Sequence, residues 1–113
     1  MEKKFNTQIA GKFLYIEFHG DIDDTVCPKY KTLISELIEQ NRTKDVVFNF
    51  KNVTFIDSSG IGLILGRYNQ LKSHRKRLYV TQTNTHIQKL FKISGIYTII
   101  KEFNLAKVGE SSE

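Results

Sequence analysis

The sequence is poor in the residues that mark crosslinked or membrane-embedded proteins. It contains one cysteine, one proline and no tryptophan. Cys27 alone cannot form a disulfide within the chain, so a crosslinked secreted scaffold is not expected. No segment approaches the ~20 consecutive apolar residues of a membrane helix, and residues 1–5 lack the apolar run of a signal peptide. We therefore expect a cytoplasmic protein that does not act in a membrane.

The length and composition are those of one globular domain. At 113 residues, of which 40% are hydrophobic and 26% charged, the chain is long enough to close a core without disulfides or metal. The last ten residues are mostly polar and end in Gly-Glu-Ser-Ser-Glu, a composition typical of frayed chain ends. We expect one domain over residues 1–103 and a frayed tail over residues 104–113.

Positive charge is concentrated in the second half of the chain. Residues 1–50 carry seven Lys or Arg against eight Asp or Glu, whereas residues 51–113 carry ten against four. The densest cluster comprises Lys72, Arg75, Lys76 and Arg77. Such a cluster can attract nucleic acid or an acidic protein surface, but cations also favour the negative end of a helix dipole. We favour a solvated helix end and keep a small basic nucleic-acid-binding domain as the alternative.

Hydrophobic patterning predicts an opening hairpin followed by alternating helices and strands. Residues 5–9 and 13–18 alternate as strands do, with a turn at residues 10–12. Pro28 suits the first turn of a helix whose apolar residues recur three and four apart as far as Ile38. Residues 45–50 form a short β-rich run typical of a buried central strand.

The second half of the chain continues this alternation. A strand-like segment at residues 53–56 precedes a helical pattern over residues 61–71, and residues 78–81 predict another strand. Asn84 or Thr85 can cap a helix that ends at Ser94 and Gly95, and residues 96–103 suit an edge strand. The order predicts an α/β fold, with a mixed four- to five-stranded sheet and helices packed mainly on one face.

The turn at residues 57–60 is the most informative local feature. Asp57, Ser58 and Ser59 can each accept a hydrogen bond from the unpaired N–H groups of the following helix, so helix capping is one interpretation. The other is phosphorylation, because a helix N-terminus favours an anion through its dipole and free amides. A phosphate on Ser58 would add about 1.5 to 2 negative charges beside the Asp57 carboxylate. Such a modification can leave the fold intact and change which partner the protein binds.

The glycines that follow do not form a dinucleotide-binding loop. Gly60, Gly62 and Gly66 are spaced one residue too long for that fingerprint, and the next strand does not end in an acidic residue. We expect Gly60 and Gly62 to give a partner close access to the helix start, and Gly66 to allow close helix packing.

The sequence offers no catalytic or metal-binding constellation. A nucleophilic serine needs a base, but none of His19, His74 and His86 stands in a recognisable relation to Ser58. These histidines and Cys27 also lack the spacing of metal ligands. We expect a binding protein rather than an enzyme, without metal or cofactor.

Three segments resemble the STAS-domain anti-sigma factor antagonists. The stretch from Val53 to Tyr68, VTFIDSSGIGLILGRY, resembles the phosphorylation-site signature of that family. The segment GDID at residues 20–23 resembles the loop after its second strand, and KLFKISG at residues 89–95 resembles its third helix. Together these segments, in the family's order, imply a STAS-type single domain.

The resemblance implies a partner switch that controls a sporulation or stress sigma factor. The unmodified protein would bind an anti-sigma factor that is also a serine kinase and holds the ATP, which forces release of the sigma factor. The kinase would phosphorylate Ser58, the modified protein would dissociate, and a serine phosphatase would restore it. The implied docking surface comprises Asp21, Asp23, Asp57, Ser58, Ser59, Gly60, Ile61 and Gly62.

The sequence also departs from the family pattern in three places. Asp21 stands where the family has glutamate, and Asp24 and Thr25 replace the histidines often found after the loop aspartate. The final helix of the family looks shortened or absent after Phe103. We expect partner specificity to differ accordingly.

Overall fold

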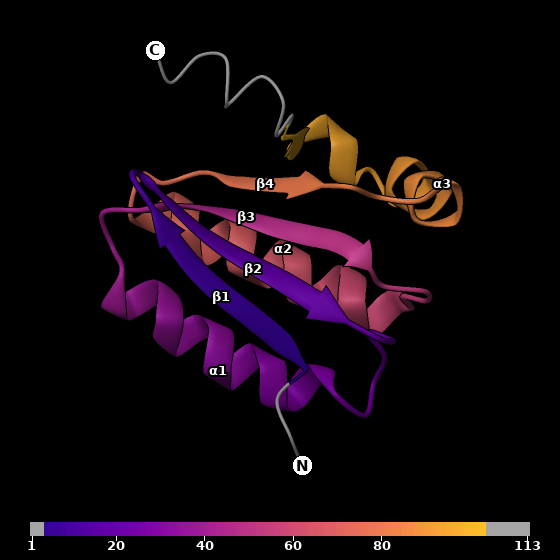
Figure 1. The fold of residues 1–113 in the computed structure, drawn as a ribbon. Coiled ribbons are helices and arrows are strands. Elements are labelled where there is room, and N and C mark those ends of the chain that lie inside the picture. Colours follow the sequence, from indigo (N-terminus) through magenta and orange to yellow (C-terminus); the bar gives the residue numbers. More distant parts are fainter. Residues whose placement is uncertain (1–3, 104–113) are drawn as a thin grey trace.

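A computed structural model describes residues 4–103, which form a five-stranded mixed sheet with helices (Figure 1). The strands follow the spatial order β1-β2-β3-β4-β5: β1 (Phe5–Ala10), β2 (Phe13–His19), β3 (Asp45–Asn52), β4 (Leu78–Thr81) and β5 (Lys101–Glu102). Strands β1 and β2 are antiparallel, and all later neighbours are parallel. The helices are α1 (Cys27–Gln40), α2 (Ser58–Ser73), α3 (Thr85–Ile93) and the 3₁₀ turn η1 (Ile96–Thr98).

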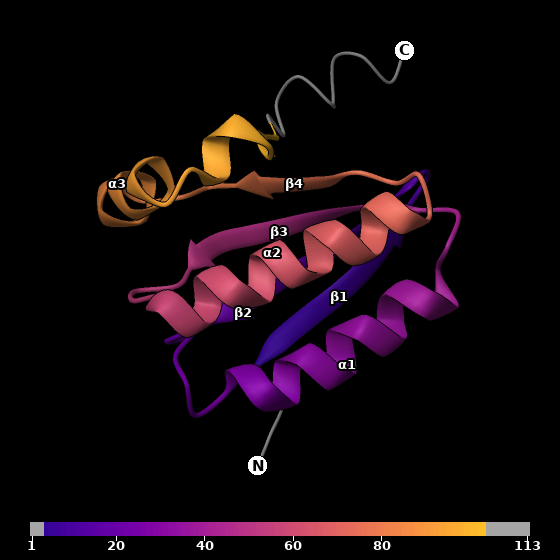
Figure 2. The same cartoon turned by 180° about the vertical axis from the view of Figure 1, so that it is seen from behind.

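Helices α1 and α2 lie side by side on one face of the sheet (Figures 1 and 2). Alternation along β2 directs Leu14, Ile16 and Phe18 toward these helices, where all three are buried. The Phe18 ring packs against Tyr30 of α1 at 5.9 Å between centroids. The predicted fold class is confirmed, and the expected tail at residues 104–113 lies outside the described residues.

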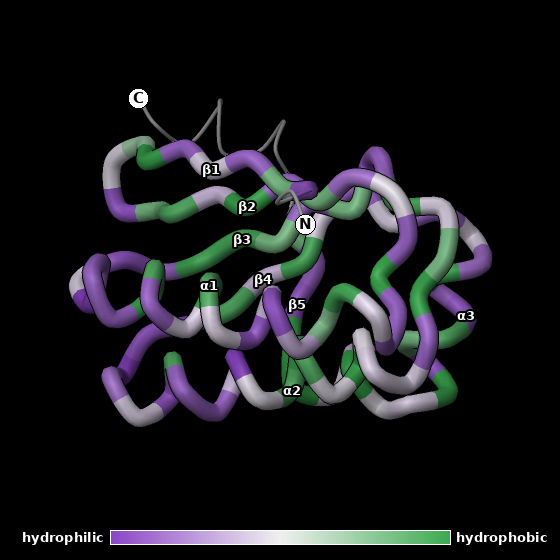
Figure 3. The backbone as a smooth tube through the Cα atoms, turned by 90° about the horizontal axis from the view of Figure 1, so that it is seen from below, coloured by the Kyte–Doolittle hydropathy of each residue, from purple (hydrophilic) through white to green (hydrophobic). Residues whose placement is uncertain are grey.

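Strand β3 lies at the centre of the sheet. Val46, Val47 and Phe48 are buried in succession, so both faces of the strand are covered. Such an unbroken apolar run is typical of a central parallel strand, and Figure 3 shows how hydrophobic the chain is along β3. On the sheet face away from α1, Phe13, Tyr15, Tyr79 and Phe103 form an aromatic cluster.

Two predicted strands are wrong or shortened. Residues 53–56 form no strand; β3 instead runs on to Asn52, and Ile56 makes a single parallel bridge with Ile22. Within residues 96–103 only Lys101–Glu102 is extended. The Ile100 N–H donates to the Ile96 carbonyl at 2.8 Å and both side chains are buried, a helical arrangement that burial of the two isoleucines stabilises.

None of the helices within residues 4–103 combines the length and hydrophobicity needed to span a membrane.

Candidate functional site

Two loops meet where β2 and β3 end. The loop after β2 and the segment after β3 are joined by backbone hydrogen bonds: Ile22 donates to the Phe55 carbonyl at 2.9 Å, and Asp57 donates to the Ile22 carbonyl at 3.3 Å. Gly20 also donates to the Asn52 carbonyl at 3.0 Å. Because parallel strands end at the same edge of a sheet, residues 20–24 and 53–58 form one continuous surface.

Asp57 is the residue that caps α2. Its Oδ1 accepts hydrogen bonds from the N–H groups of Ser59 at 2.8 Å and Gly60 at 3.3 Å. Of the three predicted caps, Asp57 is therefore the one used. The Ser58 side chain is exposed, and its hydroxyl has no hydrogen-bond partner among residues 4–103, so it is accessible to a partner protein.

This cap changes the expected environment of a phosphate on Ser58. We expected free amides at the helix start to receive the phosphate, but the Ser59 and Gly60 amides already bind the Asp57 carboxylate. The positive end of the α2 dipole would then interact with two anions, the Asp57 carboxylate and the phosphate. A phosphate on Ser58 would consequently add its charge mainly to the surface.

Two threonines fix the loop carboxylates. The Thr54 hydroxyl donates to Asp21 Oδ1 at 2.7 Å, which joins the two loops through side chains. Asp23 Oδ1 accepts from both the hydroxyl of Thr25, at 2.6 Å, and its N–H, at 3.1 Å. The Thr25 hydroxyl is the main reason that the pKa of Asp23 lies below its ordinary value. Thr25, one of the departures from the family pattern, therefore orients the aspartate on this surface.

The expected docking residues are together in space but differ in exposure. Ser58, Gly62 and Asp21 are exposed, whereas Asp23, Asp57, Ser59 and Ile61 are half-buried. Gly60 is buried, and a Cβ placed there would overlap the Ile56 side chain. Gly60 is required for packing against Ile56, and Gly62 has open space around it. The expected role of both glycines in giving a partner close access stays a prediction.

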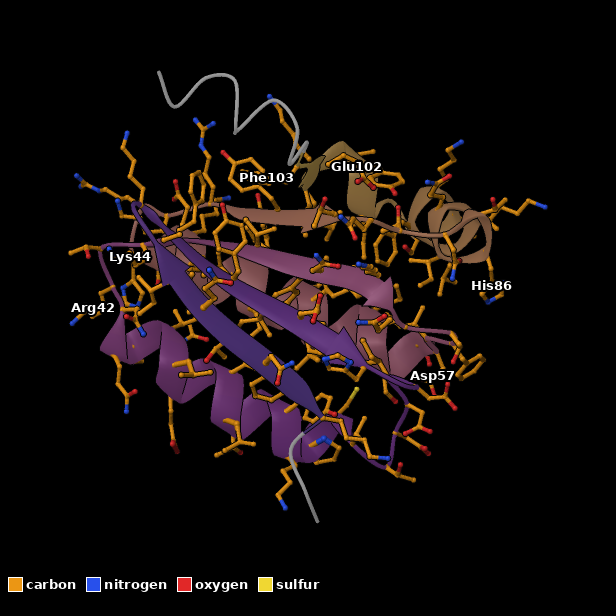
Figure 4. All side chains as sticks on the ribbon, in the orientation of Figure 1. Arg42, Lys44, Asp57, His86, Glu102 and Phe103 are labelled. Carbon is orange, nitrogen blue, oxygen red and sulfur yellow. The ribbon has the colours of Figure 1, made fainter. Side chains whose placement is uncertain are left out.

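Cys27 is buried beneath this surface, near three aspartates. Burial raises the pKa of the Cys27 thiol to about 11, and the charges of Asp57, Asp23 and Asp24 add to the effect. The thiol is neutral at physiological pH, and this end of the molecule is acidic. Figure 4 shows Asp57 at this end and Arg42 and Lys44 at the opposite one.

The structure also identifies a surface residue that the sequence patterns did not reveal. Phe55 precedes Ile56 in the segment interpreted as a strand, yet 44% of its surface is exposed. An exposed phenylalanine beside a small-residue turn is a candidate anchor for a partner. Asn84, the N-cap of α3, donates to the Val53 carbonyl at 3.3 Å and holds the same segment from the other side.

Within residues 4–103 no group of three or more His, Cys, Asp or Glu side chains is arranged to hold a metal ion.

Comparison with known protein sequences gives a family and named relatives. Residues 4–110 match the STAS domain family. The chain is 29% identical over 96 residues to the anti-sigma-B factor antagonist of Staphylococcus aureus, covering 85% of this chain and 88% of the relative. It is 29% identical over 87 residues to the anti-sigma F factor antagonist of Paenibacillus polymyxa, covering 77% and 74%.

Solved structures share the fold. The unphosphorylated anti-sigma factor antagonist SpoIIAA has a TM-score of 0.71 and 22% identity, with 96% of each chain covered. The phosphorylated form of the Bacillus protein SpoIIAA has a TM-score of 0.73 and 24% identity, with 96% of this chain and 99% of the other covered. A putative anti-sigma factor antagonist of Thermotoga maritima reaches 0.83 at 14% identity, with 95% and 92% covered. With a family match that spans nearly its whole length, this chain belongs to the STAS domain family.

Proposed function

We propose that this protein is an anti-sigma factor antagonist that acts by binding rather than catalysis. In its unphosphorylated form it binds an anti-sigma factor serine kinase, which carries the ATP, and so releases a sporulation or stress sigma factor. Phosphorylation of Ser58 by that kinase ends the binding, and a serine phosphatase reverses the modification. We expect this exchange to take place in the cytoplasm. The relatives compared above are named as antagonists of anti-sigma factors, and none of these names supports the nucleic-acid-binding alternative.

The observation that carries the proposal is the position of the Ser58 hydroxyl. It is exposed at the start of α2, on the surface where the two aspartate-bearing loops meet. An active site of a kinase can reach this hydroxyl without unfolding the turn, because Asp57 rather than Ser58 caps the helix. A structure of the Bacillus protein SpoIIAA in the phosphorylated form, with the same fold, supports a modification compatible with this domain.

The switch follows from charge and bulk at one position. Docking places Ser58 against the kinase, and the modified residue then brings about 1.5 to 2 negative charges to a surface that already holds Asp21, Asp23 and Asp57. Two amides at the helix start, those of Ser59 and Gly60, are already bound to Asp57 and are less available to neutralise a phosphate. Phosphorylation therefore opposes partner contact directly, without a change of fold.

The test is phosphorylation by candidate anti-sigma kinases from the same genome, followed by intact-mass measurement and peptide mapping. We expect one phosphate on Ser58 in the wild type and the Ser59→Ala variant, and none in Ser58→Ala. Ser58→Ala should still bind the kinase, whereas Ser58→Asp should bind at least about tenfold more weakly. A kinase that binds and is active but leaves Ser58 unmodified would contradict the phosphorylation mechanism, and wild-type affinity of Ser58→Asp would contradict release by charge.

A further inference from the structure

A groove of about 550 Å³ runs between α1 and α2. Its walls come from the first turns of α1, including Cys27 and Lys31, and its floor from α2 residues Gly62, Gly66 and Arg67. Ser58 does not line it. Ser58 and Arg67 are nine positions apart on α2, a rise of about 13 Å at 1.5 Å per residue, and Ser59, the neighbour of Ser58, lines the near end of the groove.

Arg67 is the unusual member of this groove. Only 8% of its surface is exposed, and its Nε is buried without a hydrogen-bond partner. Within residues 4–103 the side chain makes no hydrogen bond or ion pair. Burial lowers the pKa of Arg67, but a guanidinium stays ionised at physiological pH. A buried cation without a counter-charge is unfavourable unless an anion binds it.

The floor beside Arg67 is open. A Cβ added at Gly62 or Gly66 would meet no atom within 4 Å. The expectation that Gly66 permits close helix packing is therefore wrong, because no neighbouring helix approaches it. The two glycines instead leave space in front of the guanidinium, and Lys31 lines the same groove.

We propose that this groove is a binding site for a small oxyanion, a phosphate or carboxylate group, with Arg67 as its main ligand. The planar guanidinium suits both groups because it donates two parallel hydrogen bonds to either. Lys31 contributes a second positive charge, and Asp24, also in the lining, offsets one of the two. The charged side chains that line the groove thus sum to one net positive charge, and Asp23 and Asp57 act on its wall at Cys27. This balance favours a singly charged group or one oxyanion end of a small molecule.

The experiment is an NMR titration of the ¹⁵N-labelled chain with sodium phosphate and, separately, sodium acetate. The protein is first exchanged into a chloride buffer, and ionic strength is held constant because long-range charge effects depend on salt. We expect saturable shifts of the Gly62, Gly66 and Arg67 amides. Saturation with phosphate alone identifies a phosphate site, with acetate alone a carboxylate site, and with both an oxyanion site that does not discriminate.

Two variants separate binding from folding. Arg67→Met keeps an unbranched side chain but removes the charge, and should weaken binding at least about tenfold. The matched control Lys72→Met removes an exposed cation of the same helix and should leave binding unchanged. Gly66→Ala fills the open floor and should weaken binding while raising the thermal unfolding midpoint, since alanine favours a helix. The proposal is overturned if neither phosphate nor acetate gives saturable shifts, or if chloride gives equal shifts. Full binding by Arg67→Met also overturns it.

Discussion

Gly60 is the position where α2 approaches the bridge between the two loops. A Cβ there would overlap the Ile56 side chain and lie 3.1 Å from Ile22 Cγ2. Gly60→Ala should therefore lower the free energy of unfolding by roughly 1–3 kcal/mol, the usual cost of overpacking, as measured by urea denaturation. Gly62→Ala is the matched control: its Cβ meets open space, and it should gain up to about 1 kcal/mol from helix propensity. Equal stability of the two variants would show that Ile56 can move aside.

Thr25 sets the protonation of Asp23. The Thr25 hydroxyl stabilises the ionised carboxylate, so the pKa of Asp23 in the folded chain lies below its unfolded value. This contribution to stability is present above the unfolded pKa, near ~3.9, and is lost as pH falls through the folded pKa. Thr25→Val should raise the pKa of Asp23 toward the ordinary value, as measured by the pH dependence of its carboxyl ¹³C shift.

The control for this titration is Thr32→Val. Thr32 lies on α1 and its hydroxyl donates to the Pro28 carbonyl rather than to a carboxylate. The pKa of Asp23 should not change in this variant. A Thr25→Val protein with an unchanged Asp23 pKa would mean that backbone N–H groups, those of Thr25 and Val26 among them, stabilise the carboxylate without the hydroxyl.

At the scale of the element, the start of α2 depends on one side chain. Asp57→Ala removes the acceptor for the Ser59 and Gly60 amides and should cost about 0.5–2 kcal/mol in the free energy of unfolding. Asp24→Ala, which removes the same charge from an exposed loop position, should change stability by less than about 0.5 kcal/mol. Chemical denaturation of both variants distinguishes a cap from a general charge effect, and comparable losses in the two would contradict capping by Asp57.

Elements with regular hydrophobic periods were predictable, and segments governed by tertiary contacts were not. Alternation and the i, i+3, i+4 pattern located the hairpin, α1, α2 and β4, because burial of one face imposes those periods. The segment at residues 53–56 has strand-like composition, but hydrogen bonds to the loop at Ile22 determine its path. The strand predicted over residues 96–103 was likewise wrong for most of its length. Gly95, with φ of 80°, precedes a 3₁₀ turn that hydrophobic alternation does not reveal.

The candidate site divides in the same way. The order Asp-Ser-Ser-Gly predicted a helix start with an accessible serine, because capping preferences are local. The Thr25–Asp23 contact, the packing role of Gly60 and the unpaired Arg67 depend on which chain segments meet in space. Sequence periodicity contains no information about such tertiary contacts.

At the scale of the whole molecule, charge is separated along α2. Asp21, Asp23, Asp24 and Asp57 lie at the end that carries Ser58, while Lys72, Arg75, Lys76 and Arg77 follow at or just beyond the other end of the helix. The far end is fixed to α1: the His74 ring lies 2.7 Å from a Glu39 carboxylate oxygen and 3.4 Å from Arg42 Nη2. A helix of 16 residues is about 24 Å long. The two charged ends are therefore about three Debye lengths apart at physiological salt, each of about 8 Å.

This separation predicts which charges affect the association rate of a docking partner. If the proposed kinase binds at the Ser58 end, neutralising Asp21 and Asp24 to asparagine should change the association rate several-fold, because exposed charges act mainly on the association rate. Neutralising Arg75 and Arg77 to glutamine should leave that rate within about twofold, since salt screens charges at that distance. Stopped-flow association at low and physiological salt measures both. If the arginine variant changed the association rate equally at physiological salt, part of the partner would lie along α2, because salt does not screen charges that are in direct contact.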